Sequence, residues 1–141
     1  TNQHESKKDG MDMALCAFDF EKNTLKYCGA NRPIYRIRNG NLEIFYPQKA
    51  AIGFSDQGFK FENIEIELQK NDNIYLFSDG YADQFGGERD KKLTTKKFKD
   101  LLLRLQTLPM RNQGMELEKF ITDWSGTNSQ VDDMLVIGLK V

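Results

Sequence analysis

The sequence predicts an α+β fold with a mostly antiparallel sheet, and the hydrophobic pattern carries this prediction. The first half of the chain holds short apolar or alternating segments separated by turn residues, which is typical of strands. Two segments with helical spacing follow, and a strongly apolar segment, 134–141, closes the chain. Strands, then helices, then one returning strand form an α+β arrangement. The last strand must insert beside earlier ones, so we expect a sheet that is discontinuous in sequence.

The first two strands are expected to form a hairpin. Residues 13–20 are apolar and residues 24–28 continue as a second strand, so the chain should turn near Lys22. In such a hairpin Cys16 and Cys28 could face each other. Two cysteines are too few for a disulfide framework or a zinc site, and we interpret both as reduced, partly buried packing residues.

A second hairpin is predicted around Asn39-Gly40. Residues 33–38 alternate, residues 42–46 return, and the dipeptide suits a type I′ turn because both of its central residues need a positive φ. Further on, the apolar positions of 59–68 change parity. A strand with period two cannot keep both sets on one face, so we expect a bulge or break at Glu62-Asn63.

The pattern changes period after a short strand at 74–77 that is predicted to be buried on both faces. Residues 98–105 have helical spacing, with Thr94 or Thr95 available as the cap. A second helix is expected to begin at Pro109. The apolar stripes of both helices are interpreted as core faces; in the second helix these residues are Leu117, Phe120, Ile121 and Trp124.

Composition narrows the range of functions. The 141 residues fit one compact domain, and the net charge of −1 argues against nucleic acid or an anionic membrane as the main partner. No apolar run approaches the length that spans a bilayer, and the polar start is no signal peptide, so a cytoplasmic protein is expected. Residues 1–9 are expected to be a flexible segment. They contain the only histidine, His4, so no Ser-His-Asp or Cys-His triad can be built.

Acidic residues gather at the ends of three predicted strands. Carboxylates without histidine or cysteine ligands suit a hard cation such as Mg²⁺ or Mn²⁺, and the neighbouring glycines permit tight turns at the rim of a sheet. Asp-Gly is also a common turn dipeptide, so plain turn chemistry stays open as an alternative. The clusters are Asp9-Gly10-Met11-Asp12 before the first strand, Ser78-Asp79-Gly80 after 74–77, and Asp132-Asp133 before the last strand.

The adjacent carboxylates of Asp132 and Asp133 raise a geometric question. If the closing strand already begins there, the two side chains point to opposite faces of the sheet. Only one of them could then bind a given metal directly, and the other would cap a turn or act from outside the ligand set.

Five segments spread along the chain form a set of motifs. They are Asp9-Gly10-Met11-Asp12-Met13-Ala14-Leu15, Tyr27-Cys28-Gly29-Ala30-Asn31-Arg32-Pro33, Ile52-Gly53, the run from Asp72 to Gly87 that contains Ser78-Asp79-Gly80, and the run from Gln130 to Gly138. These motifs resemble those of the sporulation stage II protein E-like (SpoIIE-like) phosphatases, a bacterial branch of the metal-dependent protein phosphatase (PPM) family. The resemblance covers nearly the whole chain, and the motifs occur in family order.

The resemblance implies a β-sandwich flanked by helices, with two Mn²⁺ or Mg²⁺ ions at one end and a metal-activated water that attacks phosphoserine or phosphothreonine. It implies that Asp79 and Asp132 are metal ligands, with Asp133 as an alternative ligand or a residue just outside the ligand set. It also implies that Asp9, Gly10, Asp12 and Gly80 lie near the metal site.

One departure from the family pattern matters. The family also has an early Asp and an Asp-x-x-Gly-His-Gly segment, and this sequence has neither. We therefore expect residues 10–141 to be the C-terminal portion of one phosphatase domain whose N-terminal part is absent, and Thr1 to be an artificial or proteolytic start. Such a chain should bind metal weakly, have little or no activity, and self-associate, for example as a homodimer, through open sheet edges.

The resemblance leads to the hypothesis of a protein serine/threonine phosphatase in bacterial signalling. It implies a phosphoprotein substrate, such as an antagonist of an anti-sigma factor, and upstream sensory or repeat domains in the parent chain. The alternative is a phosphatase-like module that binds partners without catalysis. A Ca²⁺-binding β-domain is a weaker third hypothesis, because the sequence lacks a twelve-residue Asp-rich loop with a closing Glu.

Overall fold

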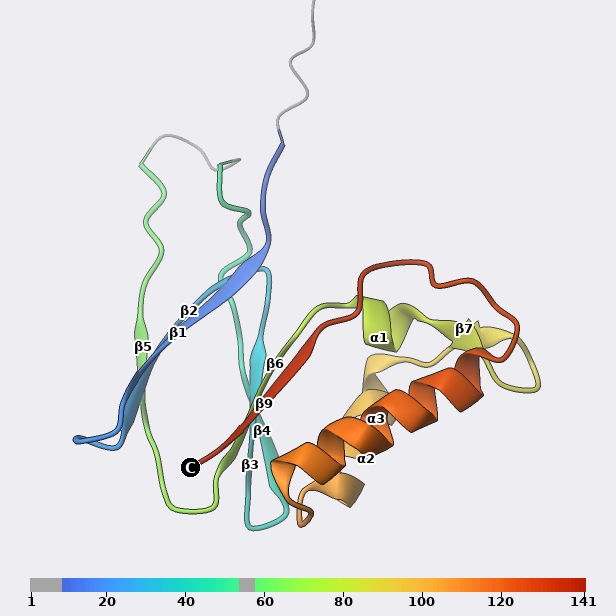
Figure 1. The fold of residues 1–141 in the computed structure, drawn as a ribbon. Helices are drawn as coiled ribbons and strands as arrows, with labels where there is room; N and C mark the ends of the chain where they lie inside the picture. The colour runs from blue at the N-terminus through green and yellow to red at the C-terminus, as the bar shows by residue number, and fades with distance from the viewer. Residues whose placement is uncertain (1–8, 54–57) are drawn as a thin grey trace, which may run out of the picture. The chain divides into compact units, whose positions relative to one another are not determined.

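The structure is a computed structural model that describes residues 9–53 and 58–141 (Figure 1). The chain forms two compact units, one of Thr1–Pro33 with Tyr46–Leu68 and one of Ile34–Phe45 with Gln69–Val141. Each unit holds an antiparallel sheet, and the helices belong to the second, so the predicted α+β class is confirmed. A flexible segment was expected at residues 1–9. Only Asp9 of this segment is described, so the rest of it, including His4, lies outside the described residues. None of the helices in the described ranges is both long and apolar enough to cross a bilayer.

The sheet of the first unit has the strand order β1-β2-β5, in which β1 is Met13–Asp19, β2 is Thr24–Ala30 and β5 is Ile64–Glu67. The hairpin that the sequence predicts near Lys22 is confirmed. Its turn is fixed by the Asp19 carboxylate, which accepts hydrogen bonds from the backbone N–H groups of Glu21 at 3.1 Å and Lys22 at 3.0 Å. Such side-chain-to-backbone bonds are why Asp favours turns.

The expectation that the two cysteine thiols face each other is wrong. In the β1–β2 register Cys16 lies opposite Tyr27, and Cys28 lies opposite Leu15. Because neighbouring residues of a strand point to opposite faces, this offset of one position places the thiols on different faces of the sheet. Both cysteines are free and half-buried, as expected. Burial raises the pKa of the Cys16 thiol to about 11, so this thiol is protonated at neutral pH.

The break expected at Glu62-Asn63 is confirmed, because β5 begins only at Ile64 and the described residues just before it are not in a strand. The side chain of Gln48 binds this irregular backbone. Its Oε1 accepts from the N–H of Glu62 at 2.7 Å, and its Nε2 donates to the carbonyl of Lys60 at 3.3 Å. The Gln48 amide thus takes the place of some of the strand-to-strand hydrogen bonds that this irregular segment lacks.

The second unit holds a four-stranded antiparallel sheet with the order β4-β3-β6-β9. Asn39 with φ 49° and Gly40 with φ 78° form the tight turn between β3 and β4, which confirms the second predicted hairpin. The closing strand, β9, pairs directly with β6 although the helices lie between these two strands in the sequence. The expected discontinuous sheet is therefore also confirmed. The strands are β3, Ile34–Arg38; β4, Asn41–Phe45; β6, Asn73–Phe77; and β9, Val136–Lys140.

Both predicted helices are present, as α2 (Thr95–Leu105) and α3 (Met110–Ser125). The Thr94 hydroxyl caps α2 by accepting from the N–H of Lys97 at 3.4 Å, and Pro109 is the cap residue of α3. Their apolar faces pack with sheet residues in the core of this unit. Figure 1 shows both helices beside the sheet that contains β3, β4, β6 and β9. Three short elements were not expected from the sequence: helix α1 (Gly80–Asp83) and strands β7 (Phe85–Gly86) and β8 (Lys91–Lys92).

A buried carboxylate ties together the turn before β6. The Asp72 side chain is fully buried and binds Arg38 of β3 through two hydrogen bonds of 2.8 Å and 2.7 Å. It also accepts from the N–H of Gln69 at 2.8 Å. Burial by itself would raise the pKa of Asp72, but the hydrogen bonds from Arg38 and Gln69 and the charges of Arg38 and Arg36 outweigh it and hold the pKa below its ordinary value.

Candidate functional site

Asp79 lies where β6 ends and α1 begins. It is the cap residue of α1, and its carbonyl accepts from the N–H of Asp83 at 3.0 Å, which closes the only turn of this helix. The residue is half-buried, in contrast to the buried start of β6. Asp79 therefore lies just after the end of a strand whose first half is buried, and its role as a ligand stays a prediction.

Ser78 joins this strand end to the loop that precedes β9. Its hydroxyl donates to the carbonyl of Asp133 at 2.7 Å and accepts from the N–H of Leu135 at 2.9 Å. The N–H of Ser78 donates to the carbonyl of Leu135 at 2.9 Å. The hydroxyl uses both its donor and an acceptor site, so it fixes the loop rather than facing a ligand. The sequence places Asp79 and Asp133 in separate motifs, and these bonds bring their backbones together.

Gly80 has a different role from the one that the sequence suggested. We expected its conformational freedom to permit a tight turn, but it is the first residue of α1 and is buried. What the position requires is space. A Cβ here would overlap the carbonyl oxygen of Asp133, lie 2.8 Å from the carbonyl carbon of Asp133, and lie 3.1 Å from the carbonyl oxygen of Asp132. The backbone of the acidic loop thus rests directly on the start of α1.

Asp132 and Asp133 both lie in the loop, because β9 begins only at Val136. The argument that the pleat of a strand turns them to opposite faces therefore does not apply. Both residues are exposed. The carboxylate of Asp132 accepts from the N–H of Asp133 at 2.7 Å, and the carbonyl of Asp132 accepts from Nε2 of Gln130 at 2.8 Å. The first of these bonds orients the Asp132 carboxylate, and the second holds its backbone.

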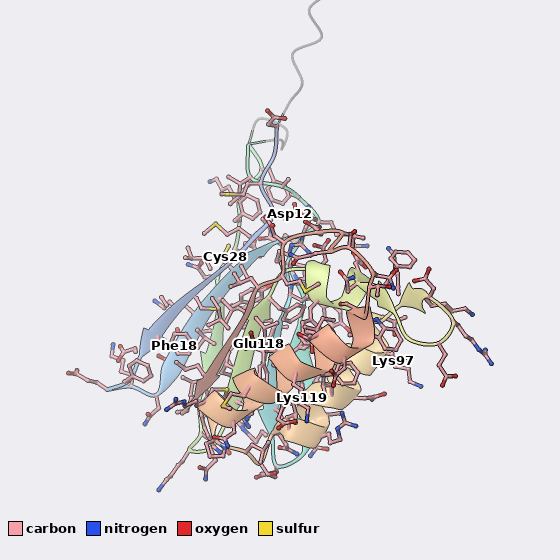
Figure 2. All side chains as sticks on the ribbon, turned by 45° about the vertical axis from the view of Figure 1, so that its right-hand side comes forward. Asp12, Phe18, Cys28, Lys97, Glu118 and Lys119 are labelled. Carbon is pink, nitrogen blue, oxygen red and sulfur yellow. The ribbon has the colours of Figure 1, made fainter. Side chains whose placement is uncertain are left out.

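The candidate acidic residues of the first unit lie before β1. Asp9, Gly10 and Asp12 are all exposed, and Asp12 is held by the motif that follows β2. Oδ1 of Asp12 accepts from Nδ2 of Asn31 at 2.9 Å, and its Oδ2 lies 3.8 Å from Nη2 of Arg32. Figure 2 labels Asp12 at the start of the first sheet. Sequence reasoning quoted Asn31 and Arg32 only as part of a motif and missed that they bind this carboxylate.

Sequence reasoning also missed Gln84, which connects α1 to the acidic loop. The side chain is fully buried, and its Nε2 donates to the carbonyl of Ser129 at 3.1 Å. The backbone carbonyl of Gln84 accepts from Nε1 of Trp124 at 3.0 Å and from the N–H of Leu93 at 3.0 Å. The only signal in the sequence is the position of Gln84 within the run that follows Asp79. Figure 1 shows α1, β7 and the segment between α3 and β9 at one end of this unit.

The two segments that meet at this end of the second unit carry carboxylates, the ligands preferred by Mn²⁺ and Mg²⁺. Within residues 9–53 and 58–141, however, no group of three or more His, Cys, Asp or Glu side chains is close enough to hold a metal ion. Asp79, Asp132 and Asp133 therefore fit part of a hard-cation site. Chemically, these residues can bind and orient such a cation, and the arrangement offers no histidine or cysteine for acid–base or nucleophilic work.

Solved structures define the class of protein. The SiaA-PP2C domain of Pseudomonas aeruginosa matches 92% of the chain with 25% identity and a TM-score of 0.84, and the match covers 51% of that chain. The RsbU and RsbW domains of Rv1364c from Mycobacterium tuberculosis match 92% with 19% identity and a TM-score of 0.71, over 35% of that chain. The Mn-presoaked phosphatase domain of SpoIIE from Bacillus subtilis matches 92% with 16% identity and a TM-score of 0.62, over 56% of that chain. The fold is that of the PP2C-type (PPM) phosphatases.

The family follows from the sequence itself. The sequence model of the family "Stage II sporulation protein E (SpoIIE)" matches residues 2–141, and the chain belongs to this family. The resemblance inferred from the motifs is thereby confirmed. No curated protein is a significant match. The chain spans about half the length of the SiaA-PP2C domain.

Proposed function

We propose that this chain is part of a metal-dependent protein serine/threonine phosphatase and that Asp79 and Asp132 are ligands of Mn²⁺ or Mg²⁺. One observation carries the proposal. Ser78 binds the backbone of Asp133, 55 residues away in sequence, so two acidic motifs meet at the end of β6. The close approach of Asp133 to Gly80 supports the same geometry. The family and the PP2C-type fold supply the reaction class.

The residues of this chain would act by binding and orientation. When bound, the pair of ions supplies a water activated for in-line attack on the phosphoester. Asp79 is fixed by the end of β6 and the start of α1, and Asp132 by its bond to the N–H of Asp133. Ser78 holds the two segments together. Asp133 is proposed as an alternative ligand or as a residue that orients Asp132.

The remaining ligands are proposed to come from outside the residues that meet here. Two observations support this: the described residues gather no set of three ligand side chains, and the chain spans about half of the SiaA-PP2C domain. Residues 10–141 would then be the C-terminal portion of one phosphatase domain. Asp9, Gly10 and Asp12 are proposed to lie near the metal site, with Asp12 held in place by Asn31 and Arg32.

The proposed substrate is a phosphoprotein in bacterial signalling, with an antagonist of an anti-sigma factor as one candidate. Two neighbours support this setting by their descriptions: one combines RsbU and RsbW domains, and PppA of Pseudomonas aeruginosa is a key regulatory component of T6SS. A phosphatase-like module without catalysis is the second candidate. This candidate needs no complete metal site, and the described residues gather no group of three ligand side chains.

Metal binding by the full-length protein tests the proposal. Asp79→Asn and Asp132→Asn should each weaken Mn²⁺ binding, measured by isothermal titration calorimetry, by about 100-fold or more, because even residues that only orient a ligand contribute 10- to 100-fold. Hydrolysis of a phosphoserine peptide should fall in parallel. Asp100→Asn, an exposed carboxylate on α2, is the matched control and should change neither. Unchanged Mn²⁺ affinity in Asp79→Asn would remove this residue from the site, and full-length protein without any metal-dependent hydrolysis would favour the non-catalytic module.

A further inference from the structure

A groove of about 370 Å³ lies beside the short β7–β8 hairpin, and none of the carboxylates proposed as metal ligands lines it. One wall consists of residues 86–89 and Lys91 from the hairpin, and the other of Lys97 from α2 and Trp124 from α3. The β7–β8 hairpin, which was not expected from the sequence, thus forms one side of this groove. Neither the fold nor the proposed metal chemistry requires it.

The lining of this groove is basic. Arg89, Lys91 and Lys97 contribute three positive charges, against the single carboxylate of Glu88. The chain as a whole carries a net charge of −1, so this concentration of positive charge is local. The side chains of all four residues are exposed, and Figure 2 labels Lys97 beside the helices at the edge of this unit. Such a surface attracts negatively charged groups.

Trp124 gives the groove a wall of fixed position. Nζ of Lys97 lies 4.6 Å from the centre of the indole ring, a cation–π contact that orients the ammonium group. The N–H of Gly87 donates to the carbonyl of Trp124 at 3.0 Å. A Cβ on Gly87 would lie 2.8 Å from the ring, so the hairpin backbone packs flat against it. The groove is therefore preformed, which lowers the entropic cost of binding.

The groove is connected to the acidic site by short contacts within the same unit. Nζ of Lys92 in the hairpin lies 3.5 Å from Oδ1 of Asp83 in α1, and the N–H of Thr94 donates to the carbonyl of Ala82 at 2.8 Å. Gln84 binds the carbonyl of Ser129 in the loop that carries Asp132. Figure 1 shows β7, α1 and this loop at one end of the unit. The hairpin is thus joined by direct contacts to the helix that Asp79 caps, and Gln84 joins that helix to the loop that carries Asp132.

Resting on the proposed phosphatase function, we infer that this groove docks an acidic segment next to the phosphorylated residue of the protein substrate. The net positive charge of the groove favours a negatively charged occupant. Arg89 can bind a carboxylate through two parallel hydrogen bonds. The lysines add positive charge and do not require a particular hydrogen-bond geometry. The groove is too small, and the chain too near neutrality, for the long phosphate tracks that nucleic acids need. The groove would thus select among phosphoproteins, while the carboxylates bind the metal.

Trp124 is the only tryptophan of these 141 residues and lines the groove, so the part of the emission that Trp124→Phe removes reports on the groove. A phosphoserine peptide with flanking Glu residues should change the emission of the full-length protein, and the same peptide with Gln in place of Glu should bind at least about tenfold more weakly. Binding of a labelled peptide, followed by anisotropy, tests the variants. Arg89→Gln, Lys91→Gln and Lys97→Gln should each weaken binding about two- to fivefold, the usual range for exposed charge pairs.

Two further variants make the test specific. Glu88→Gln removes the one opposing charge and should strengthen binding of the acidic peptide, whereas Lys119→Gln, an exposed lysine of α3 outside the groove, should leave it unchanged. Equal affinity for the Glu and Gln peptides, or equal weakening by Lys119→Gln, would overturn the inference. So would a single-stranded oligonucleotide that displaces the peptide at matched charge, because the surface would then be a general polyanion site.

Hydrolysis of p-nitrophenyl phosphate separates this inference from the function on which it rests. This small substrate has no flanking residues, so the three charge variants should retain wild-type kcat and KM with it, while KM for the acidic peptide rises. No metal-dependent hydrolysis of either substrate by the wild type would refute the proposed function. Normal hydrolysis of the small substrate without any preference for acidic flanks would refute the docking groove alone.

Discussion

Gly80→Ala is the substitution that most directly tests how the candidate site is built. The added Cβ would overlap the carbonyl oxygen of Asp133 and lie 2.8 Å from its carbonyl carbon, where an ordinary contact needs at least 3.4 Å. Both obstacles are backbone atoms, so no side-chain rotation can relieve them. The acidic loop must therefore move away from α1 by roughly half an ångström or more, and overpacking of this kind destabilises proteins by about 1–3 kcal/mol.

The same displacement should affect metal binding. Ser78 holds the loop through bonds of 2.7 Å and 2.9 Å, and a shift of the loop lengthens or breaks them. Asp132 then moves relative to Asp79, and misplacement of functional groups by about 1 Å can reduce activity by 100-fold. We expect Gly80→Ala in the full-length protein to lower both the free energy of unfolding, measured by urea denaturation, and the Mn²⁺ affinity, measured by calorimetry.

Gly114→Ala is the matched control. Gly114 is also a helical glycine, in α3, but an added Cβ there meets nothing within 4 Å. This substitution should stabilise the protein by about 0.5–1 kcal/mol, because alanine favours helices over glycine, and should leave Mn²⁺ binding unchanged. If Gly80→Ala resembles Gly114→Ala in both measurements, the close packing of the acidic loop on α1 is not a requirement of the site, and the reasoning is refuted.

Two further predictions concern stability and assembly. Asp72→Asn should lower the free energy of unfolding at pH 7 by about 2–3 kcal/mol, because the bonds to Arg38 lose their charge. Since the folded-state pKa of Asp72 is below the ordinary 3.8, its contribution is present above that value and lost as the pH falls through the folded-state pKa. Urea denaturation of both proteins should therefore give a difference that shrinks at acidic pH, and a constant difference would contradict the assignment. The 141-residue chain should self-associate through edge strand β9, where Ile137 is 48% exposed. Ile137→Lys should then restore a monomer in sedimentation velocity, and a wild-type monomer at high concentration would exclude this interface.

The fold was predictable wherever the signal is local. Asn39-Gly40 and the Thr94 cap act within a few residues, so the sequence alone locates the turn and the helix start. The cysteines show the limit. Whether Cys16 faces Cys28 depends on the strand register, and an offset of one residue reverses the answer. Helix α1 and strands β7 and β8 have only four, two and two residues, too few for a periodicity to be seen.

The candidate site was predictable as a set of residues but not as a geometry. Family motifs point to Asp79 and Asp132, yet no spacing rule indicates that Ser78 binds a backbone 55 residues away. Gly80 is a similar case. A glycine in sequence suggests a positive φ, whereas here the need for glycine arises from a distant segment that crosses it. Such contacts depend on which distant parts of the chain pack together, and no local sequence pattern indicates this.

The way in which the two acidic motifs meet also bears on how metal and fold depend on each other. Asp79 and Asp132 lie on segments that are joined through backbone contacts of Ser78 and Gly80. A cation bound by both carboxylates adds a second link between the same segments. Because a ligand that binds only the folded arrangement stabilises it, metal affinity and the stability of the contact between α1 and the acidic loop must rise and fall together. In the proposed site, the residues that hold the backbone would therefore contribute to the strength of metal binding together with the carboxylates.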